Sequence, residues 1–187
     1  MALNSASFIR QLLNNPSQVG AVAPSSRHLA KAMAEGLGAS SGHVIEIGPG
    51  TGSITRGILE TGVDPRNLHL FELNPAFCET LRQKFAGVAV YNQMAQEMTA
   101  LGLNDVSCVI SSLPMLNMPQ AIQLEIVTSV FETLMPGGKL VQFTYRSRPP
   151  INQTICQQLE LRWEKRRTVW ANLPPAHVYV YEKALQT

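Results

Sequence analysis

The chain has 187 residues, of which 15% are charged, and its formal net charge is only +2. This length suits one domain with a sizeable core, and the small charge argues against a strong general attraction for nucleic acid. No apolar run approaches the roughly 18 residues of a transmembrane helix, and no signal-peptide pattern opens the chain. The three cysteines and four histidines match no disulfide or metal-ligand spacing. We therefore expect a cytoplasmic protein without a metal site.

The first segment predicts an amphipathic helix. Phe8, Ile9, Leu12 and Leu13 recur at a spacing that places them on one helical face. Such a face packs on the rest of the domain, or it rests on a lipid surface where Arg10 reaches the headgroups. The sequence leaves both alternatives open.

A loop of small residues, 20–26, follows this helix. Ser25 or Ser26 is placed to act as the N-cap of a second helix over residues 27–36.

The stretch 44–52, Val-Ile-Glu-Ile-Gly-Pro-Gly-Thr-Gly, is the most informative part of the chain. Its apolar start predicts a buried parallel strand, and the three alternating glycines predict a tight turn before a helix that begins at Ser53. Thr51 or Ser53 is placed to cap that helix. Backbone at such a turn closely approaches a nucleotide-like ligand. The E-x-G-x-G-x-G spacing resembles the S-adenosylmethionine loop of Rossmann-like methyltransferases. This resemblance implies that the loop residues contact the cofactor: Glu46, Gly48, Gly50, Thr51 and Gly52.

A second acidic residue follows at the interval that the first motif predicts. Residues 68–72 read as a strand ending at Glu72, about 20 residues after the glycine loop, where nucleotide-binding folds place a ribose-binding carboxylate. Leu73 and Asn74 would then flank the adenine, and Pro75 would open the next helix.

Strands and helices alternate along the remaining chain. A helix is predicted over 121–134, and further strands over 88–91, 106–111, 139–145, 161–169 and 178–182. This alternation predicts an α/β domain with a parallel sheet covered by helices on both faces. The loop 172–175 is short enough for a hairpin, so one terminal strand should run antiparallel. The expected fold is the seven-stranded, mostly parallel sheet of Rossmann-like methyltransferases.

Several further segments resemble a narrower family. Residues 15–27, together with Ser-Leu-Pro-Met at 112–115, Gln-Phe-Thr-Tyr at 142–145 and Asn-Leu-Pro-Pro-Ala at 172–176, resemble bacterial phospholipid N-methyltransferases of the phosphatidylethanolamine type. The similarity extends from about residue 8 to residue 182. It implies a phospholipid substrate and peripheral association with the inner face of the membrane. It also implies that the loop 20–26 closes over the cofactor, with Ser25 and Ser26 as hydrogen-bond donors to it. These serines belong to a lid-like segment, residues 1–40, ahead of the cofactor-binding domain, residues 41–187.

The chain departs from that family after its third strand. The family carries a small-acidic pair that meets the adenine amino group, whereas this chain has Gln93, Met94 and Ala95. We expect these three residues at the adenine, with the Gln93 amide as the acceptor.

The loop after the fourth strand bears on the substrate. Enzymes that methylate base amino groups place Asn or Asp, then Pro and an aromatic ring at this point. Here Ser111, Ser112 and Leu113 precede Pro114 and Met115, so neither a planar acceptor nor a stacking ring is present. This favours a small amine on a flexible chain over a nucleobase, with Ser111 beside the cofactor and Ser112 and Leu113 at the reacting amine. The alternative is a buried loop without a catalytic role.

Tyr145, Arg146 and Arg148 end the fifth strand. Tyr145 is predicted to orient the amine or shield the cation that forms, and either arginine to pair with a phosphodiester. A solvated loop is the alternative. A basic cluster, Arg162, Lys165, Arg166 and Arg167, lies near Trp163 and Trp170 in the predicted sixth strand. It suits an anionic membrane interface, or it protects an edge strand by charge.

These patterns favour S-adenosylmethionine-dependent N-methylation of phosphatidylethanolamine or its methylated derivatives. Two other functions remain open. One is methylation of rRNA adenine, because the Leu-Pro of the fourth-strand loop resembles that group. The other is cofactor binding at a membrane without catalysis, because the acidic residue near Gln93 is missing.

Overall fold

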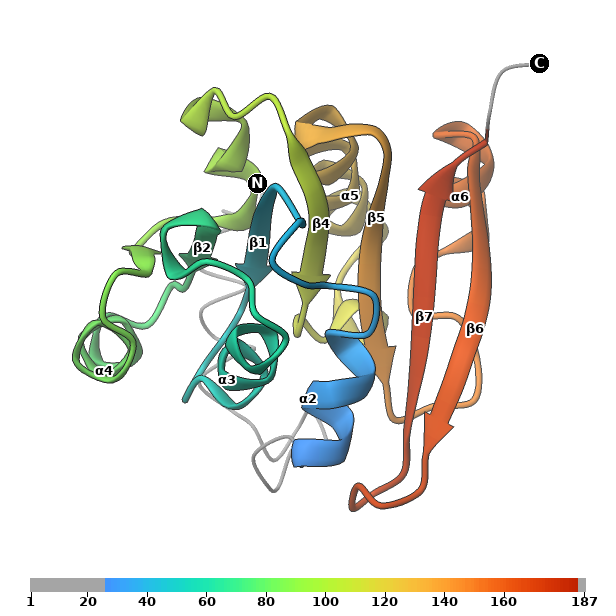
Figure 1. The fold of residues 1–187 in the computed structure, drawn as a ribbon. Helices are drawn as coiled ribbons and strands as arrows, with labels where there is room; N and C mark the ends of the chain where they lie inside the picture. The colour runs from blue at the N-terminus through green and yellow to red at the C-terminus, as the bar shows by residue number, and fades with distance from the viewer. Residues whose placement is uncertain (1–25, 185–187) are drawn as a thin grey trace.

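The computed structural model describes residues 26–184, which form a seven-stranded sheet in the order β3-β2-β1-β4-β5-β7-β6 (Figure 1). The strands are β1 (His43–Ile47), β2 (Leu68–Phe71), β3 (Ala89–Tyr91), β4 (Val106–Ser111), β5 (Leu134–Thr144), β6 (Leu161–Val169) and β7 (Ala176–Lys183). The helices are α2 (Arg27–Met33), α3 (Ser53–Glu60), α4 (Pro75–Lys84), α5 (Gln120–Thr133) and α6 (Gln153–Gln158). Short 3-10 turns cover Pro65–Asn67, Ala95–Leu101 and Met115–Asn117.

The central strands run parallel, as their apolar sequences predict. β1 pairs in parallel with β2 on one side and with β4 on the other, and its residues Val44 to Ile47 are all buried. β7 pairs antiparallel with both β5 and β6. The predicted antiparallel terminal hairpin is therefore confirmed, and β7 is the reversed strand.

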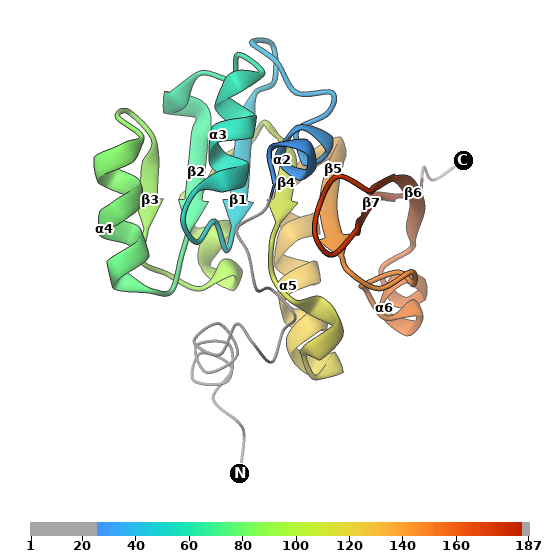
Figure 2. The same cartoon turned by 90° about the horizontal axis from the view of Figure 1, so that it is seen from below.

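Helices cover both faces of this sheet, which confirms the predicted layering (Figure 2). α2, α3 and α4 bury Leu29, Ile58 and Leu81 against one face, in a core cluster with Val44 and Val180. α5 and α6 pack on the other face, where a second cluster surrounds Ile45 and Ile126. Each strand therefore supplies side chains to both cores, and its carboxyl end lies between the two layers.

β5 begins five residues earlier than predicted. Leu134 already pairs with Val106, and the register then shifts so that Lys139 pairs with Cys108. Pro136, Gly137 and Gly138 lie inside this irregularity. Gly138 fits there because a Cβ would lie 2.9 Å from the Met135 carbonyl oxygen. The strand therefore continues, with this irregularity in its pairing, through residues with low strand propensity.

The prediction that a side chain caps α3 is wrong. The N-cap residue is Gly52, in the left-handed region with φ 84°, and neither Thr51 nor Ser53 caps the helix. Since glycine has no side chain, the loop reaches the helix through backbone conformation alone.

α2 begins as predicted, with the Ser26 hydroxyl accepting from the Leu29 N–H at 3.2 Å. The predicted helix around residues 8–13 and Ser25 lie outside the described residues, so the division at residue 40 stays a prediction. None of the helices within 26–184 is both long and apolar enough to cross a membrane.

Candidate active site

The carboxyl ends of β1, β2 and β4 lie side by side and are joined by backbone hydrogen bonds. The Gly48 N–H donates to the Phe71 carbonyl at 2.9 Å, and the Ser112 N–H donates to the Ile47 carbonyl at 3.0 Å. The Glu72 N–H likewise donates to the Tyr91 carbonyl at the end of β3. The loops that carry the predicted site residues therefore leave the sheet from fixed positions. Ligands of open α/β sheets bind at this edge.

The three glycines of the loop differ in what a side chain would meet at each position. All have positive φ, but a Cβ at Gly48 would lie 2.9 Å from the Leu113 Cδ2, and one at Gly52 would collide with the ring of Phe85, which directly follows α4. A Cβ at Gly50 (φ 55°) would meet no atom within 4 Å. Gly48 and Gly52 are thus required by packing within the protein, whereas Gly50 faces open space.

Glu72 anchors the loop. One carboxylate oxygen accepts from the Gly50 N–H at 3.0 Å, and the other accepts from the Asn74 N–H at 2.8 Å. Burial raises the pKa of Glu72, and the bonds from the Asn74, Gly50 and Leu73 backbone oppose this shift. Asn74 in turn caps α4, and Pro75 opens that helix as predicted. The carboxylate therefore joins the glycine loop to the β2–α4 turn, and its remaining lone pairs are available to a ligand.

Glu46 is fully buried beneath the N-terminus of α3. Its Oε2 accepts a hydrogen bond of 2.6 Å from the Thr55 hydroxyl, whereas its Oε1 has no partner among the described residues. Burial raises the pKa of Glu46 to about 8, and the nearby Glu72 carboxylate adds to this rise, whereas the bonds from Thr55 oppose it. A buried acceptor without a donor is uncommon in proteins. Its position beside the glycine loop suits a ligand that brings positive charge.

A small pocket opens between the ends of the first four strands. Five of its lining residues were predicted as site residues: Gly48, Leu73, Gln93, Ala95 and Leu113. Ile47 and Phe71 also line it and were missed, because nothing distinguishes them in the sequence from other buried strand residues. Met94 does not line this pocket, and its N–H donates to the Glu97 carboxylate at 2.7 Å. The lining is mainly apolar, like the faces of a heterocycle, and the pocket would have to widen to admit one.

A second group of predicted residues meets at Asn172, which the site prediction had not included. The Asn172 side-chain oxygen accepts from the Ser26 N–H at 3.0 Å, and its side chain also hydrogen-bonds with Tyr145. Burial raises the pKa of Tyr145, and the bond with Asn172 opposes this shift. The start of α2, the end of β5 and the β6–β7 loop are thus held at one point.

Gln142 positions the loop after β4 and was also missed. Its side-chain amide donates to the Leu113 carbonyl at 2.9 Å and to the Phe143 carbonyl at 2.9 Å, while its Oε1 is buried without a partner among residues 26–184. The Ser111 hydroxyl accepts from the Leu113 N–H at 3.3 Å. Leu113 is therefore fixed from both sides, and its carbonyl accepts a second hydrogen bond, from the Met115 N–H at 2.9 Å.

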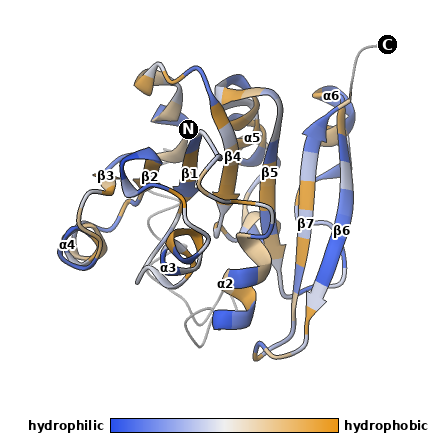
Figure 3. Cartoon of the chain, viewed as in Figure 1, coloured by the Kyte–Doolittle hydropathy of each residue, from blue (hydrophilic) through white to orange (hydrophobic). Residues whose placement is uncertain are grey.

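Two arginines of β6 form ion pairs, whereas those that follow β5 form none within residues 26–184. On β6, Arg167 pairs with Glu35 at 3.0 Å and Arg162 pairs with Glu182 at 3.8 Å. Arg146 and Arg148 are exposed after β5, and neither forms an ion pair with another described residue. Figure 3 shows β6 as a largely hydrophilic edge strand. This pattern favours the interpretation of the β6 cluster as a charge-protected edge.

Comparisons with known proteins show which fold the chain shares. No protein-family model matches the chain. The chain is 26% identical to an ornithine lipid N-methyltransferase from Singulisphaera acidiphila, over 92% of each chain. Among solved structures it resembles a TehB-like SAM-dependent methyltransferase from Corynebacterium glutamicum, with a TM-score of 0.64 and 14% identity over 96% of this chain and 98% of that chain. It also resembles the CcbJ methyltransferase from Streptomyces caelestis, with a TM-score of 0.66 and 16% identity over 84% of this chain and 94% of that chain. The fold is that of the Rossmann-like methyltransferases, as predicted.

Within residues 26–184, no group of histidine, cysteine and carboxylate side chains is arranged to hold a metal ion. The residues present do fit the predicted cofactor. The open space at Gly50, the free acceptor of Glu46 and the apolar pocket lie along one edge of the sheet.

Proposed function

We propose that this protein is an S-adenosylmethionine-dependent methyltransferase that acts on the amine of a membrane lipid. The observation that carries the proposal is the arrangement of Gly50 and Glu72, in which an open glycine turn is held by a buried carboxylate at the sheet edge. The cofactor is S-adenosylmethionine. Its methionine portion lies along the Gly48–Gly52 turn, its ribose at Glu72, and its adenine in the pocket near Leu73 and Ala95.

The electrostatics of the site support a cationic cofactor. Glu46 and Glu72 are both buried, and the charge of the Glu72 carboxylate opposes ionisation of Glu46. A sulfonium and an ammonium near the loop would stabilise the ionised carboxylates and lower their pKa values. When bound, the cofactor supplies a methyl group on a positively charged sulfur.

The chain's own residues would position the amine. The Tyr145 hydroxyl is a candidate acceptor for its N–H groups, and Ser112 and Leu113 are the candidate residues of the loop after β4 at the amine. Since an amine must be neutral to attack, its desolvation in the closed site favours the reactive form. Holding the amine in line with the methyl group is then the main contribution of the protein.

The proposed lipid is phosphatidylethanolamine or one of its methylated derivatives. Arg146 and Arg148 are exposed at the same edge and suit a phosphodiester. Ornithine lipid is a second candidate, because the relative at 26% identity is named for its N-methylation. Either lipid stays in a bilayer, so we place the protein at the cytoplasmic face of the membrane, with the segment 1–14 as a contributing anchor.

Label transfer tests this function. The purified protein is incubated with methyl-labelled S-adenosylmethionine and vesicles that contain phosphatidylethanolamine, vesicles that contain ornithine lipid, or rRNA. We expect label in lipid and none in rRNA. Label in rRNA alone would favour the adenine-methylating alternative, and binding of the cofactor without any transfer would favour the non-catalytic one.

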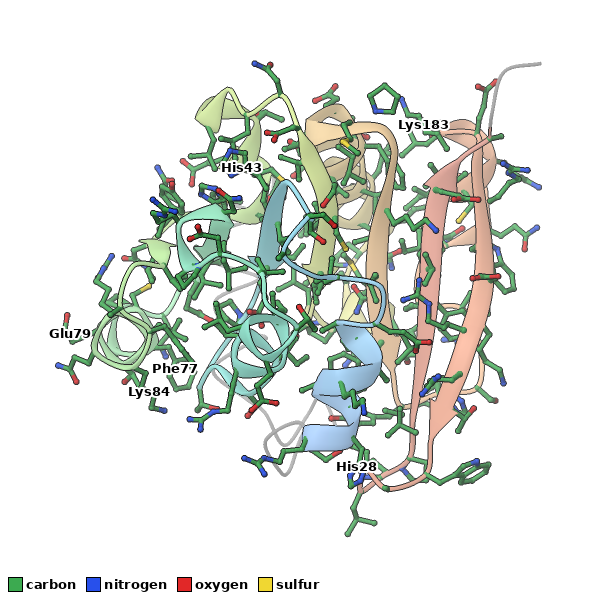
Figure 4. The ribbon with its side chains drawn as sticks, in the orientation of Figure 1. His28, His43, Phe77, Glu79, Lys84 and Lys183 are labelled. Atoms are coloured by element: carbon green, nitrogen blue, oxygen red, sulfur yellow. The ribbon has the colours of Figure 1, made fainter. Side chains whose placement is uncertain are left out.

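Replacement of Glu72 tests the ribose site. Glu72→Ala removes a charge-assisted acceptor worth about 1.5–3 kcal/mol, which corresponds to about ten-fold or more in cofactor affinity. Calorimetric titration with S-adenosylmethionine measures this loss. Glu79→Ala is the matched control, because Glu79 points away from the site on the outer face of α4 (Figure 4). An unchanged dissociation constant for Glu72→Ala would remove Glu72 from the cofactor site.

A further inference from the structure

The tip of the β6–β7 hairpin exposes two large apolar side chains. Trp170 is 78% exposed and Leu173 is 87% exposed, more than any other large hydrophobic residue between 26 and 184. The tip projects past the carboxyl end of β5, at the edge that carries the candidate site (Figure 1). Single exposed apolar residues are ordinary, but two at one turn beside a site indicate a contact surface.

The tip is held in place by its own buried residue. Asn172, between the two exposed residues, is 5% exposed and bonds to Ser26 at the start of α2. Its amide also donates to the Pro174 carbonyl at 2.8 Å. His28, in the first turn of α2, lies beside the tip (Figure 4). Trp170 and Leu173 are thus presented from a fixed turn, so little conformational entropy would be lost when they are buried.

The segments that meet at the tip carry only positive charge. Residues 26–34, 145–152 and 168–177 contain no aspartate or glutamate and include four cations: Arg27, Lys31, Arg146 and Arg148. Arg27, Arg146 and Arg148 are exposed and form no ion pair with a described residue. Two cations of β6 differ from these, since Arg162 and Arg167 pair with the protein's own carboxylates. Unneutralised positive charge around an apolar tip is complementary to an anionic lipid surface.

We propose that the β6–β7 hairpin tip docks the protein on an anionic bilayer, with Trp170 and Leu173 in the interfacial layer and the surrounding cations on the headgroups. This inference rests on the proposed function, because a lipid substrate requires the site to face the bilayer. Tryptophan is favoured at membrane interfaces, where its ring is half apolar and half hydrated. RNA fits less well, because Leu173 and Pro174 offer an aliphatic surface beside the single ring of Trp170.

Vesicle binding of the full chain tests the docking surface. The double variant Trp170→Ser/Leu173→Ser is compared with the parent on phosphatidylcholine vesicles with and without phosphatidylglycerol. The double variant lacks the two apolar side chains that the parent would bury in the bilayer. Its binding to the anionic vesicles should therefore be weaker by about ten-fold or more. Met135→Ser is the matched control, because Met135 is an exposed apolar residue at the start of β5, at the opposite end of that strand from the tip, and it should bind like the parent.

Fluorescence reports on the tip itself. The chain has two tryptophans, so Trp163→Phe leaves Trp170 as the only one. Its emission should shift to the blue on anionic vesicles, and added salt should reduce the shift. An unshifted emission, equal binding of the double variant and the parent, or equal binding to neutral and anionic vesicles would overturn the proposal. Tip-dependent binding to RNA in place of vesicles would also overturn it.

Methyl transfer to detergent-dispersed lipid is measured separately with the same variants. If the variants still transfer methyl groups and bind vesicles like the parent, the docking surface is rejected and the proposed function stands. Tip-dependent vesicle binding without any methyl transfer would leave the docking surface and reject the proposed function.

Discussion

Gly50→Val is expected to lower the affinity for S-adenosylmethionine by about 100-fold or more, or about 2.8 kcal/mol, while the protein remains folded. The reason is steric. A Cβ at Gly50 meets no protein atom within 4 Å, so the branched side chain would occupy the open space that we assign to the methionine portion of the cofactor. Calorimetry measures the affinity, and thermal unfolding measures the stability.

Valine substitutions at two other glycines distinguish the effect of backbone strain from that of steric exclusion of the cofactor. Gly102 has φ 62°, and a Cβ there would meet no atom within 4 Å, but it lies at the end of the turn Ala95–Leu101, away from the glycine loop. Gly102→Val therefore carries similar left-handed strain, about 1–2 kcal/mol, and should bind the cofactor normally. Gly52→Val should instead destabilise the fold, because its side chain would collide with Phe85 and Leu81. Normal cofactor binding by Gly50→Val would reject the loop site.

Stability should fall as the pH rises from about 5 to about 8 because of Glu46. Its pKa is raised from 4.5 to about 8 in the folded protein, so over this range the unfolded chain loses a proton that the folded chain retains. Each pH unit then costs at most about 1.4 kcal/mol in the free energy of unfolding. The contribution is fully present below the unfolded pKa and is lost once the pH passes the folded value.

Glu46→Gln removes this titration and keeps the shape of the side chain. The variant should therefore gain stability relative to the parent as the pH rises, by at most about 4 kcal/mol between pH 5 and 8. Chemical denaturation at several pH values measures the difference. Glu60→Gln replaces an exposed carboxyl group on α3, so its stability should change with pH as that of the parent does. Parallel profiles for Glu46→Gln and the parent would show that Glu46 is already ionised.

The parts of the site that the sequence could predict are those with a fixed local spacing. The glycine loop and Glu72 are recognisable because a turn at the end of one strand and a carboxylate at the end of the next recur at a set interval. The alternation of strands and helices likewise predicts the sheet and its terminal hairpin. The extended start of β5 was hidden, because an irregularity in the pairing accommodates Pro136 and Gly137 within a strand.

The missed residues depend on contacts between distant segments. Asn172 meets Ser26 across 146 residues, and Gln142 meets Leu113 across 29 residues. A polar residue at either position has no local pattern that reveals its partner. Ile47 and Phe71 line the pocket through their position at the strand ends, and their residue types are those of any buried strand.

A crystal structure with S-adenosylhomocysteine bound tests the central claim most directly. We predict that the ribose hydroxyls lie within hydrogen-bonding distance of the Glu72 carboxylate, with the homocysteine portion along Gly50. The adenine should lie against Phe71, Leu73 and Leu113. A ligand bound elsewhere, or a ribose that does not contact Glu72, would contradict this account.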